Sequence, residues 1–99
     1  MAWVFRAIGN RDKNAVTGGR RITVPQGANG GYIQALTQNI RVSFDDNAPA
    51  TASDGMQIKA GNDVRWMWLA AGSSFSVNEE VATAGFYWQA GLMAWVEWP

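Results

Sequence analysis

The 99-residue sequence contains neither cysteine nor histidine. Without cysteine no disulfide can staple the fold, and cysteine usage gives no information about the redox compartment. The missing histidine removes the commonest general base and the commonest protein metal ligand. Charge is also scarce, because charged residues make up 16% of the chain and the formal net charge is 0. This balance lacks the basic footprint of a nucleic-acid-binding protein, so we expect no nucleic-acid partner.

Long apolar runs are absent as well. No run reaches the roughly 18 residues that span a bilayer, so we expect no membrane partner. The first ten residues, MAWVFRAIGN, lack the long apolar core and the small-residue cleavage site of a secretory signal peptide. We therefore expect a protein that is made in the cytoplasm, or one that is exported by lysis. The length suits one domain with a modest core.

The chain instead contains many short runs in which side chains of two kinds alternate, separated by Gly, Asn, Asp and Pro. The pattern predicts strands over 2–8, 21–24, 32–36, 39–45, 56–60, 64–69, 75–77, 86–89 and 91–98. Residues 78–84 are the one helix-compatible stretch, with Asn78 placed as an N-cap. We predict an all-β fold, a single-domain antiparallel β-sandwich of about 7–9 short strands. We divide the chain into an N-terminal strand or arm, 1–19, and a sandwich domain, 20–99.

Acidic residues supply two candidate sites, and neither has the pattern its chemistry needs. Asp45 and Asp46, with Asp54 and Asp63 further on, lack the ligand spacing of a calcium loop. Turn formation explains the pair better, because short polar side chains bond their own backbone. Glu79–Glu80 would have to act as the acid and base of a glycosidase, but adjacent strand residues face opposite ways.

A glycine cluster at Gly27, Gly30 and Gly31 superficially resembles a phosphate-binding loop. No Lys-Ser/Thr pair follows it, and no helix supplies a dipole. We therefore predict no catalytic, cofactor-binding or metal-binding residue, and we expect that the protein is not an enzyme.

The aromatic residues leave two interpretations open. Six tryptophans and two tyrosines are more than the core of so small a domain holds, since each buries roughly 150–250 Å². The excess would form either a sugar-stacking platform or, as we prefer, a subunit interface, where Trp and Tyr are enriched. Trp66 and Trp68 share one strand face, and we predict that they belong to the core. The predicted interface residues are Trp3, Phe5, Trp95 and Trp98.

The central stretch, residues 38–64, reads QNIRVSFDDNAPATASDGMQIKAGNDV. It resembles a pattern in small structural proteins of tailed phages: a strand reading I-R-x-x-[FL]-D, a turn, A-P-[TA]-A-[ST]-x-G, an apolar pair and a Gly-Asp or Gly-Asn turn. The matching residues are Ile40–Asp45, Ala48–Gly55, Ile58 and Gly61–Asn62. Asp45–Asp46 stands where family members often have Asp-Gly, and the segment up to Gly19 has no counterpart.

The resemblance implies a β-sandwich that decorates or cements a capsid, or that sits in the tail, and it implies no catalytic residues. We therefore expect a virion structural protein, a cement or decoration protein on the outer surface of a phage capsid. Its expected partners are the major capsid protein and further copies of itself in a homo-oligomer, and no cofactor is expected. A tail or baseplate component and a carbohydrate-binding module are the alternatives.

Overall fold

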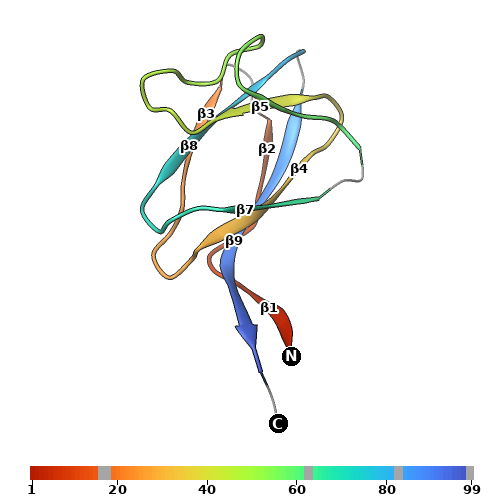
Figure 1. The fold of residues 1–99 in the computed structure, drawn as a ribbon. Coiled ribbons are helices and arrows are strands. Elements are labelled where there is room, and N and C mark those ends of the chain that lie inside the picture. Colours follow the sequence, from red (N-terminus) through yellow and green to blue (C-terminus); the bar gives the residue numbers. More distant parts are fainter. Residues whose placement is uncertain (16–18, 62–63, 82–83, 98–99) are drawn as a thin grey trace.

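The computed structural model describes residues 1–15, 19–61, 64–81 and 84–97, and these form nine strands and no helix. Two antiparallel sheets pack face to face, which confirms the predicted β-sandwich (Figure 1). The strands are β1 (Ala2–Ala7), β2 (Asp12–Ala15), β3 (Arg20–Thr23), β4 (Gly30–Ala35), β5 (Ile40–Ser43), β6 (Met56–Ile58), β7 (Arg65–Trp68), β8 (Ser74–Glu79) and β9 (Gly85–Val96).

The larger sheet is built around β9, which is 12 residues long. β1 and β2 lie end to end along one edge of β9, pairing with 91–96 and 85–88 respectively. β4 pairs with the other edge of β9, over residues 86–91, and β7 pairs with the far side of β4. The order across this sheet is therefore β1 and β2, then β9, β4 and β7.

The smaller sheet has the order β3-β8-β5-β6, so the central stretch of the sequence supplies its β5–β6 half. Alternation places Ser76 and Asn78 of β8 on the face opposite to the buried Phe75 and Val77. The loop between β5 and β6 crosses that outer face. The Ser76 Oγ accepts the Ala50 N–H at 2.7 Å, and the Asn78 Nδ2 donates to the Ala50 carbonyl at 3.1 Å. Both backbone groups of Ala50, the N–H and the carbonyl, are therefore hydrogen-bonded to side chains of β8, which holds the loop against the sheet.

The core fills the space between the two sheets. Phe75 of β8 and Trp88 of β9 meet across it edge to face, with ring centroids 5.0 Å apart. The predicted inward residues Ile22 and Val24 are buried, as the alternation indicated. The buried cluster is Ile22, Val24, Ala28, Ile33, Ala35, Ile40, Val42, Ile58, Phe75, Val77, Ala84, Phe86, Trp88 and Ala90.

The last part of β9 leaves the body of the sandwich. β4 reaches β9 only as far as Gly91, so residues 92–96 pair with β1 alone. Figure 1 shows these two strands extending below the two packed sheets, with the N-terminus near the end of the extension. We call this two-stranded ribbon, residues 2–7 and 91–96, the arm. It makes the molecule elongated, with principal extents of 50 × 29 × 21 Å.

Three elements differ from what the sequence pattern indicated or allowed. Asn78 and Glu79 complete β8 and so do not open a helix. Residues 86–89 and 91–98 were expected as two strands, but Gly85–Val96 is one continuous strand. Residues 12–15, which belong to none of the predicted strands, form β2, because the free edge of β9 offers them a strand to pair with. The predicted division of the chain into an N-terminal segment, 1–19, and a sandwich domain, 20–99, stays a prediction.

Candidate functional site

Aromatic side chains gather on the outer face of the larger sheet. On β4, Ile33 and Ala35 point into the core, so Tyr32 points outward. Trp66 lies opposite Tyr32 on β7, and the pair Trp3–Trp95 joins β1 to β9. All four strands of the sheet at this level contribute. We call the whole set the aromatic face; its members are Trp3, Phe5, Tyr32, Trp66, Trp68 and Trp95.

The rings of the aromatic face touch one another in an unbroken series. The ring-centroid distances are 5.5 Å for Trp95–Trp3, 5.7 Å for Trp3–Trp68, 5.2 Å for Trp68–Trp66, 5.1 Å for Trp66–Tyr32 and 5.0 Å for Tyr32–Phe5. The planes of these neighbours cross at 66° to 84°, which is edge-to-face packing. Each such contact adds about 0.5–1.5 kcal/mol beyond the area it buries. The series therefore holds the side chains in fixed positions.

Two glycines form the floor of the aromatic face. Gly91 of β9 lies opposite Gly30 of β4 in the register. A Cβ on Gly91 would overlap the Phe5 ring, and one on Gly30 would overlap the Met67 carbonyl oxygen and lie 2.8 Å from the Trp66 Cζ2. The missing side chains therefore leave the space that these two rings occupy.

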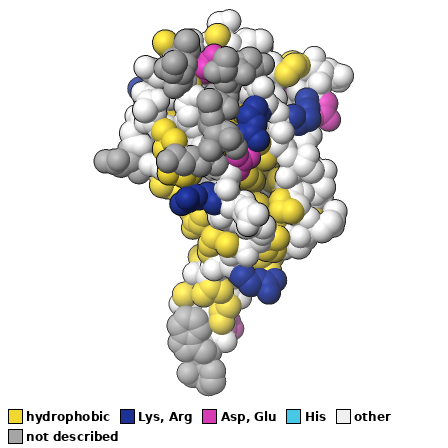
Figure 2. Space-filling view, turned by 180° about the vertical axis from the view of Figure 1, so that it is seen from behind, with side chains coloured by type: hydrophobic (Ala, Val, Ile, Leu, Met, Phe, Trp, Pro, Cys, Tyr) yellow, Lys and Arg dark blue, Asp and Glu magenta, His cyan; other side chains and the backbone are white. Residues whose placement is uncertain are grey.

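Half of the aromatic face remains open to solvent. Trp3, Trp68 and Trp95 are 57%, 58% and 48% exposed, and Trp3 contacts both of the others. At roughly 250 Å² for a whole indole side chain, the three leave on the order of 400 Å² of apolar surface in water. The largest apolar patch on a typical monomer is about 300–600 Å² and is often functional. In the view from behind, further apolar side chains run along the arm (Figure 2).

The structure brings three of the four predicted interface residues together, since Trp3, Phe5 and Trp95 all belong to the aromatic face. Trp98 lies outside the described residues. Their role in an interface stays a prediction.

The prediction that Trp66 and Trp68 belong to the core is wrong. They share one face of β7, as the alternation indicated, but it is the outer face. Trp88 is the buried tryptophan among those described. Sequence reasoning thus missed Tyr32, Trp66 and Trp68 as parts of the exposed group. The available signal is Gly91, which interrupts an otherwise apolar run in β9.

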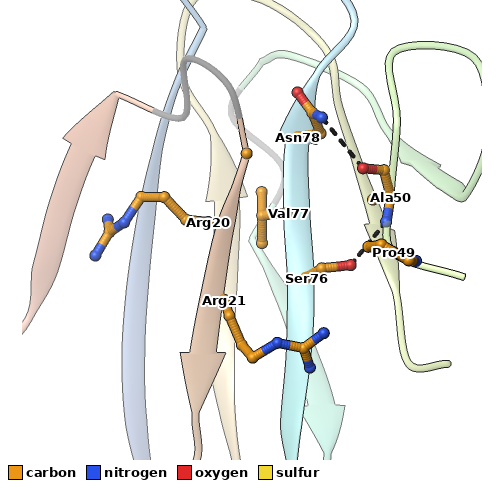
Figure 3. A pocket seen from close by; sticks show the side chains of 8 residues that line it. Arg20, Arg21, Pro49, Ala50, Ser76, Val77 and Asn78 are labelled. Atoms are coloured by element: carbon orange, nitrogen blue, oxygen red, sulfur yellow. Dashed lines mark hydrogen bonds between the residues drawn. The ribbon is translucent and has the colours of Figure 1, made fainter. Parts of the chain in front are cut away.

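A shallow pocket of about 330 Å³ lies on the smaller sheet, between β3, β8 and the loop that carries Ala50 (Figure 3). Its polar side chains are already engaged. Arg20 forms a bidentate pair with Asp12 at 3.0 and 3.2 Å. Arg21 donates to the Asp46 carboxylate at 2.7 Å and to the Ser74 Oγ at 3.0 Å. With Ser76 and Asn78 bound to the loop backbone, this pocket stabilises the fold and offers a ligand little to bind.

The acidic candidates serve structural roles where the structure describes them. The Asp45 Oδ1 accepts the Asn47 N–H at 2.9 Å, which confirms the turn interpretation. Glu80 lies beyond the end of β8, and its Oε2 contacts the Gln57 Nε2 at 2.7 Å and the Arg41 Nε at 2.8 Å. The hydrogen bond from Gln57, together with the Arg41 charge, holds the pKa of Glu80 below its ordinary value.

Within the described ranges, no three acidic, histidine or cysteine side chains are grouped so that they could hold a metal ion. Asp63 is outside those ranges. Gly30 and Gly31 open β4, and so they precede a strand, which offers a phosphate no helix N-terminus.

Comparison with known proteins gives no match to any family model, any curated protein or any solved structure. Within the described part of the chain, no helix is long and apolar enough to cross a membrane. Function is therefore inferred from the residues and geometry of the chain itself.

Proposed function

We propose that this chain is a non-catalytic structural protein of a phage virion, and that it binds the outer surface of the capsid through its aromatic face. One observation carries the proposal: three half-exposed indoles in mutual contact on a rigid sheet. Tryptophan is enriched among the residues that dominate protein–protein binding energy. A ready-made group of fixed rings loses little conformational entropy on binding, which favours affinity.

The resemblance to phage structural proteins concerns the other side of the molecule. The matching stretch supplies β5, β6 and the loop that Ser76 and Asn78 fasten to β8. It therefore supports the scaffold. The aromatic face is built on the opposite sheet, and half of its rings come from β1 and β9, the first and last strands of the chain. This arrangement fits a protein whose smaller sheet is a scaffold shared with related proteins, while its larger sheet carries a binding face specific to one capsid.

The proposed mechanism is the burial of apolar area across joints between capsid subunits, so that neighbouring subunits are held together. A stable interface buries roughly 1,600 Å² in total, about 800 Å² on each partner. The exposed indoles supply about half of one partner's share, by the roughly 400 Å² estimated from their size. Many copies on a symmetric shell would then reinforce one another by multivalency.

Carbohydrate binding is the second candidate, and the exposed indoles are the observation that favours it. Stacking on a sugar requires an open, flat ring face. Trp3 stands at 66° to Trp68 and at 69° to Trp95, so neighbouring rings present edges beside faces and form no flat platform. This geometry favours an irregular protein surface over a sugar ring. Titration with glycans, followed by tryptophan fluorescence, separates the two candidates, because a stacked sugar would shift or quench the emission.

The test of capsid binding uses purified phage particles that lack the chain, to which the wild type and two variants are added back. Trp68→Ala removes a half-exposed ring from the aromatic face, and we expect its affinity to fall at least tenfold, the hot-spot scale of about 1.4 kcal/mol or more. Met56→Ala is the matched control, because Met56 is 57% exposed but lies on β6 of the opposite sheet. Equal binding of Trp68→Ala and wild type, or no binding by either, would contradict the proposal.

A further inference from the structure

We infer that the arm is a self-association element, in which the outer edge of β1 pairs antiparallel with β1 of a second copy of this chain. The inference concerns the isolated protein and does not depend on the capsid role.

The direction of the peptide groups in β1 follows from the bonds of its neighbour. Asn29 bonds the backbone of β9 from the β4 side: its N–H donates to the Gly91 carbonyl at 3.0 Å, and its side chain exchanges two 2.8 Å bonds with Met93. Odd-numbered residues of β9 therefore direct their peptide groups toward β4. Even-numbered residues direct theirs toward β1, as the bond from Ile8 N to the Ala90 carbonyl at 2.9 Å confirms.

In the register, the even residues of β9 face Ala2, Val4 and Arg6. Because peptide groups alternate in direction along a strand, those of Trp3, Phe5 and Ala7 point to the other side. That side is the edge of the sheet, where no described strand pairs with β1. Each of these residues thus presents an N–H and a C=O along an open edge.

This edge lacks the usual protection. Natural edge strands are short, bulged, covered, or interrupted by proline and charge, because an open edge templates the addition of another strand. β1 contains no proline, and Arg6 is its one charged residue. The arm also exposes apolar side chains on both faces, with Trp3 57% and Val4 42% exposed. A two-stranded ribbon on its own is marginal in water, so a further strand on the β1 edge would stabilise the arm.

The β1 strand of a second copy can bond every outward N–H and C=O of this edge in one antiparallel register, which is centred on Phe5. Trp3 of each copy then lies opposite Ala7 of the other, and every outward N–H and C=O of the three residues gains a partner. On the aromatic face of the joined strands, the Trp3 ring lies beside the Ala7 methyl group, and Phe5 lies opposite Phe5 of the second copy. On the other side Arg6 lies opposite Val4, which keeps the two arginines from facing each other. The occupant that the pattern of β1 fits is therefore β1 itself.

In such a dimer the two arms lie side by side and the two bodies lie at opposite ends. This placement is open, because the arm extends beyond the packed sheets (Figure 1). The two larger sheets would join into one, and their aromatic faces would become continuous across the joint.

The test measures the mass of the purified chain in solution by sedimentation equilibrium, at tens of micromolar. We expect a dimer for the wild type and for Ala7→Ser, which keeps the outward N–H. Ala7→Pro removes that donor from both copies, at an edge position where proline is compatible with a strand. We expect Ala7→Pro to dissociate at least tenfold more readily. A monomeric wild type, or an Ala7→Pro variant that dimerises as the wild type does, would overturn the inference.

A second measurement guards against misfolding of the proline variant. The chain has no cysteine, so a Val4→Cys/Arg6→Cys double variant places the only thiols at a pair that faces across the proposed joint. Mild oxidation should give a disulfide-linked dimer on a non-reducing gel, and Met56→Cys, on the opposite sheet, should not. Failure of the double variant to cross-link would overturn the inference, whereas failed particle binding by Trp68→Ala concerns the capsid proposal alone.

Discussion

Two glycines set how closely the rings of the aromatic face approach the sheet. Gly91 gives its space to the Phe5 ring, and Gly30 gives its space to Trp66. An alanine at position 91 would displace the Phe5 ring, and one at position 30 would overlap the Met67 carbonyl of β7 as well as approach the Trp66 ring. Small residues on this face therefore have a packing role that a turn-based interpretation of glycine overlooks.

We predict that Gly91→Ala destabilises the fold, because its Cβ would overlap both the Phe5 ring and the Arg6 carbonyl. Overpacking of this kind costs about 1–3 kcal/mol. Urea denaturation gives the change in the free energy of unfolding. The same substitution made in a Phe5→Ala background should cost less, since one of the two clashes is gone. Equal costs in the two backgrounds would show that the ring does not rest on Gly91.

At the scale of elements, Glu80 joins segments that are distant in the sequence. Its carboxylate contacts Arg41 of β5 and Gln57 of β6 just beyond the end of β8. Asn39 donates to the same carboxylate at 3.5 Å and accepts the Ala60 N–H at 2.8 Å. The network fixes one end of the smaller sheet.

We predict a pH-dependent effect of Glu80→Gln. The folded-state pKa of Glu80 lies below its ordinary value of 4.5, first because of the Gln57 hydrogen bond and then because of Arg41. The carboxylate therefore stabilises the fold above pH 4.5, and this contribution is lost as the pH falls through the folded-state pKa. The Tm of Glu80→Gln should lie below that of the wild type at pH 7, with the gap closing in acid.

Asp46→Asn is the matched control for that measurement. It removes the Arg21–Asp46 pair, in which both side chains are largely exposed, and such pairs contribute little. Its Tm should stay near that of the wild type at both pH values. A gap for Glu80→Gln that persists unchanged into acid would mean that the carboxylate charge is not the cause.

The strands were predicted well where polar and apolar residues alternate and turn-forming residues mark both ends of the run. Ile40 and Val42 of β5, and Phe75 and Val77 of β8, alternate with polar residues and are buried as that period implies. β9 was divided in two because Gly91 resembles a strand breaker. In the structure Gly91 stays within the strand, because it pairs with Ala7 of β1 on one side and with Gly30 of β4 on the other. β2 was missed because its pairing with β9 is a tertiary effect that local composition does not show.

At the scale of the whole molecule, the sequence predicted the sandwich but not which face of β7 would point outward. Alternation with a period of two residues places Trp66 and Trp68 on the same face of the strand. It does not tell whether that face points into the core or toward solvent. Pairing with β4 decides the matter, because Ile33 and Ala35 occupy the inner face there. The exposed group therefore became visible only once strands from both ends of the chain were assembled in one sheet.

The molecule thus has two distinct parts. The packed sheets hold the core, and the arm, with the outer side of the larger sheet, holds most of the exposed aromatic surface. Scarce charge on a small chain is consistent with a surface that partners cover, since 16% charged residues leave much apolar area to shield. A structural role in a larger assembly accounts for both parts.

The copy number of this chain in purified phage particles tests that role most directly. Quantitative mass spectrometry would compare it with the major capsid protein. The proposed shell-covering role predicts a ratio on the order of one to one, as multivalent cover of a symmetric shell requires. A ratio far below that would place the chain at the tail or at a vertex and would contradict the capsid proposal. Absence from the particles would contradict any structural role in the virion and would favour carbohydrate binding.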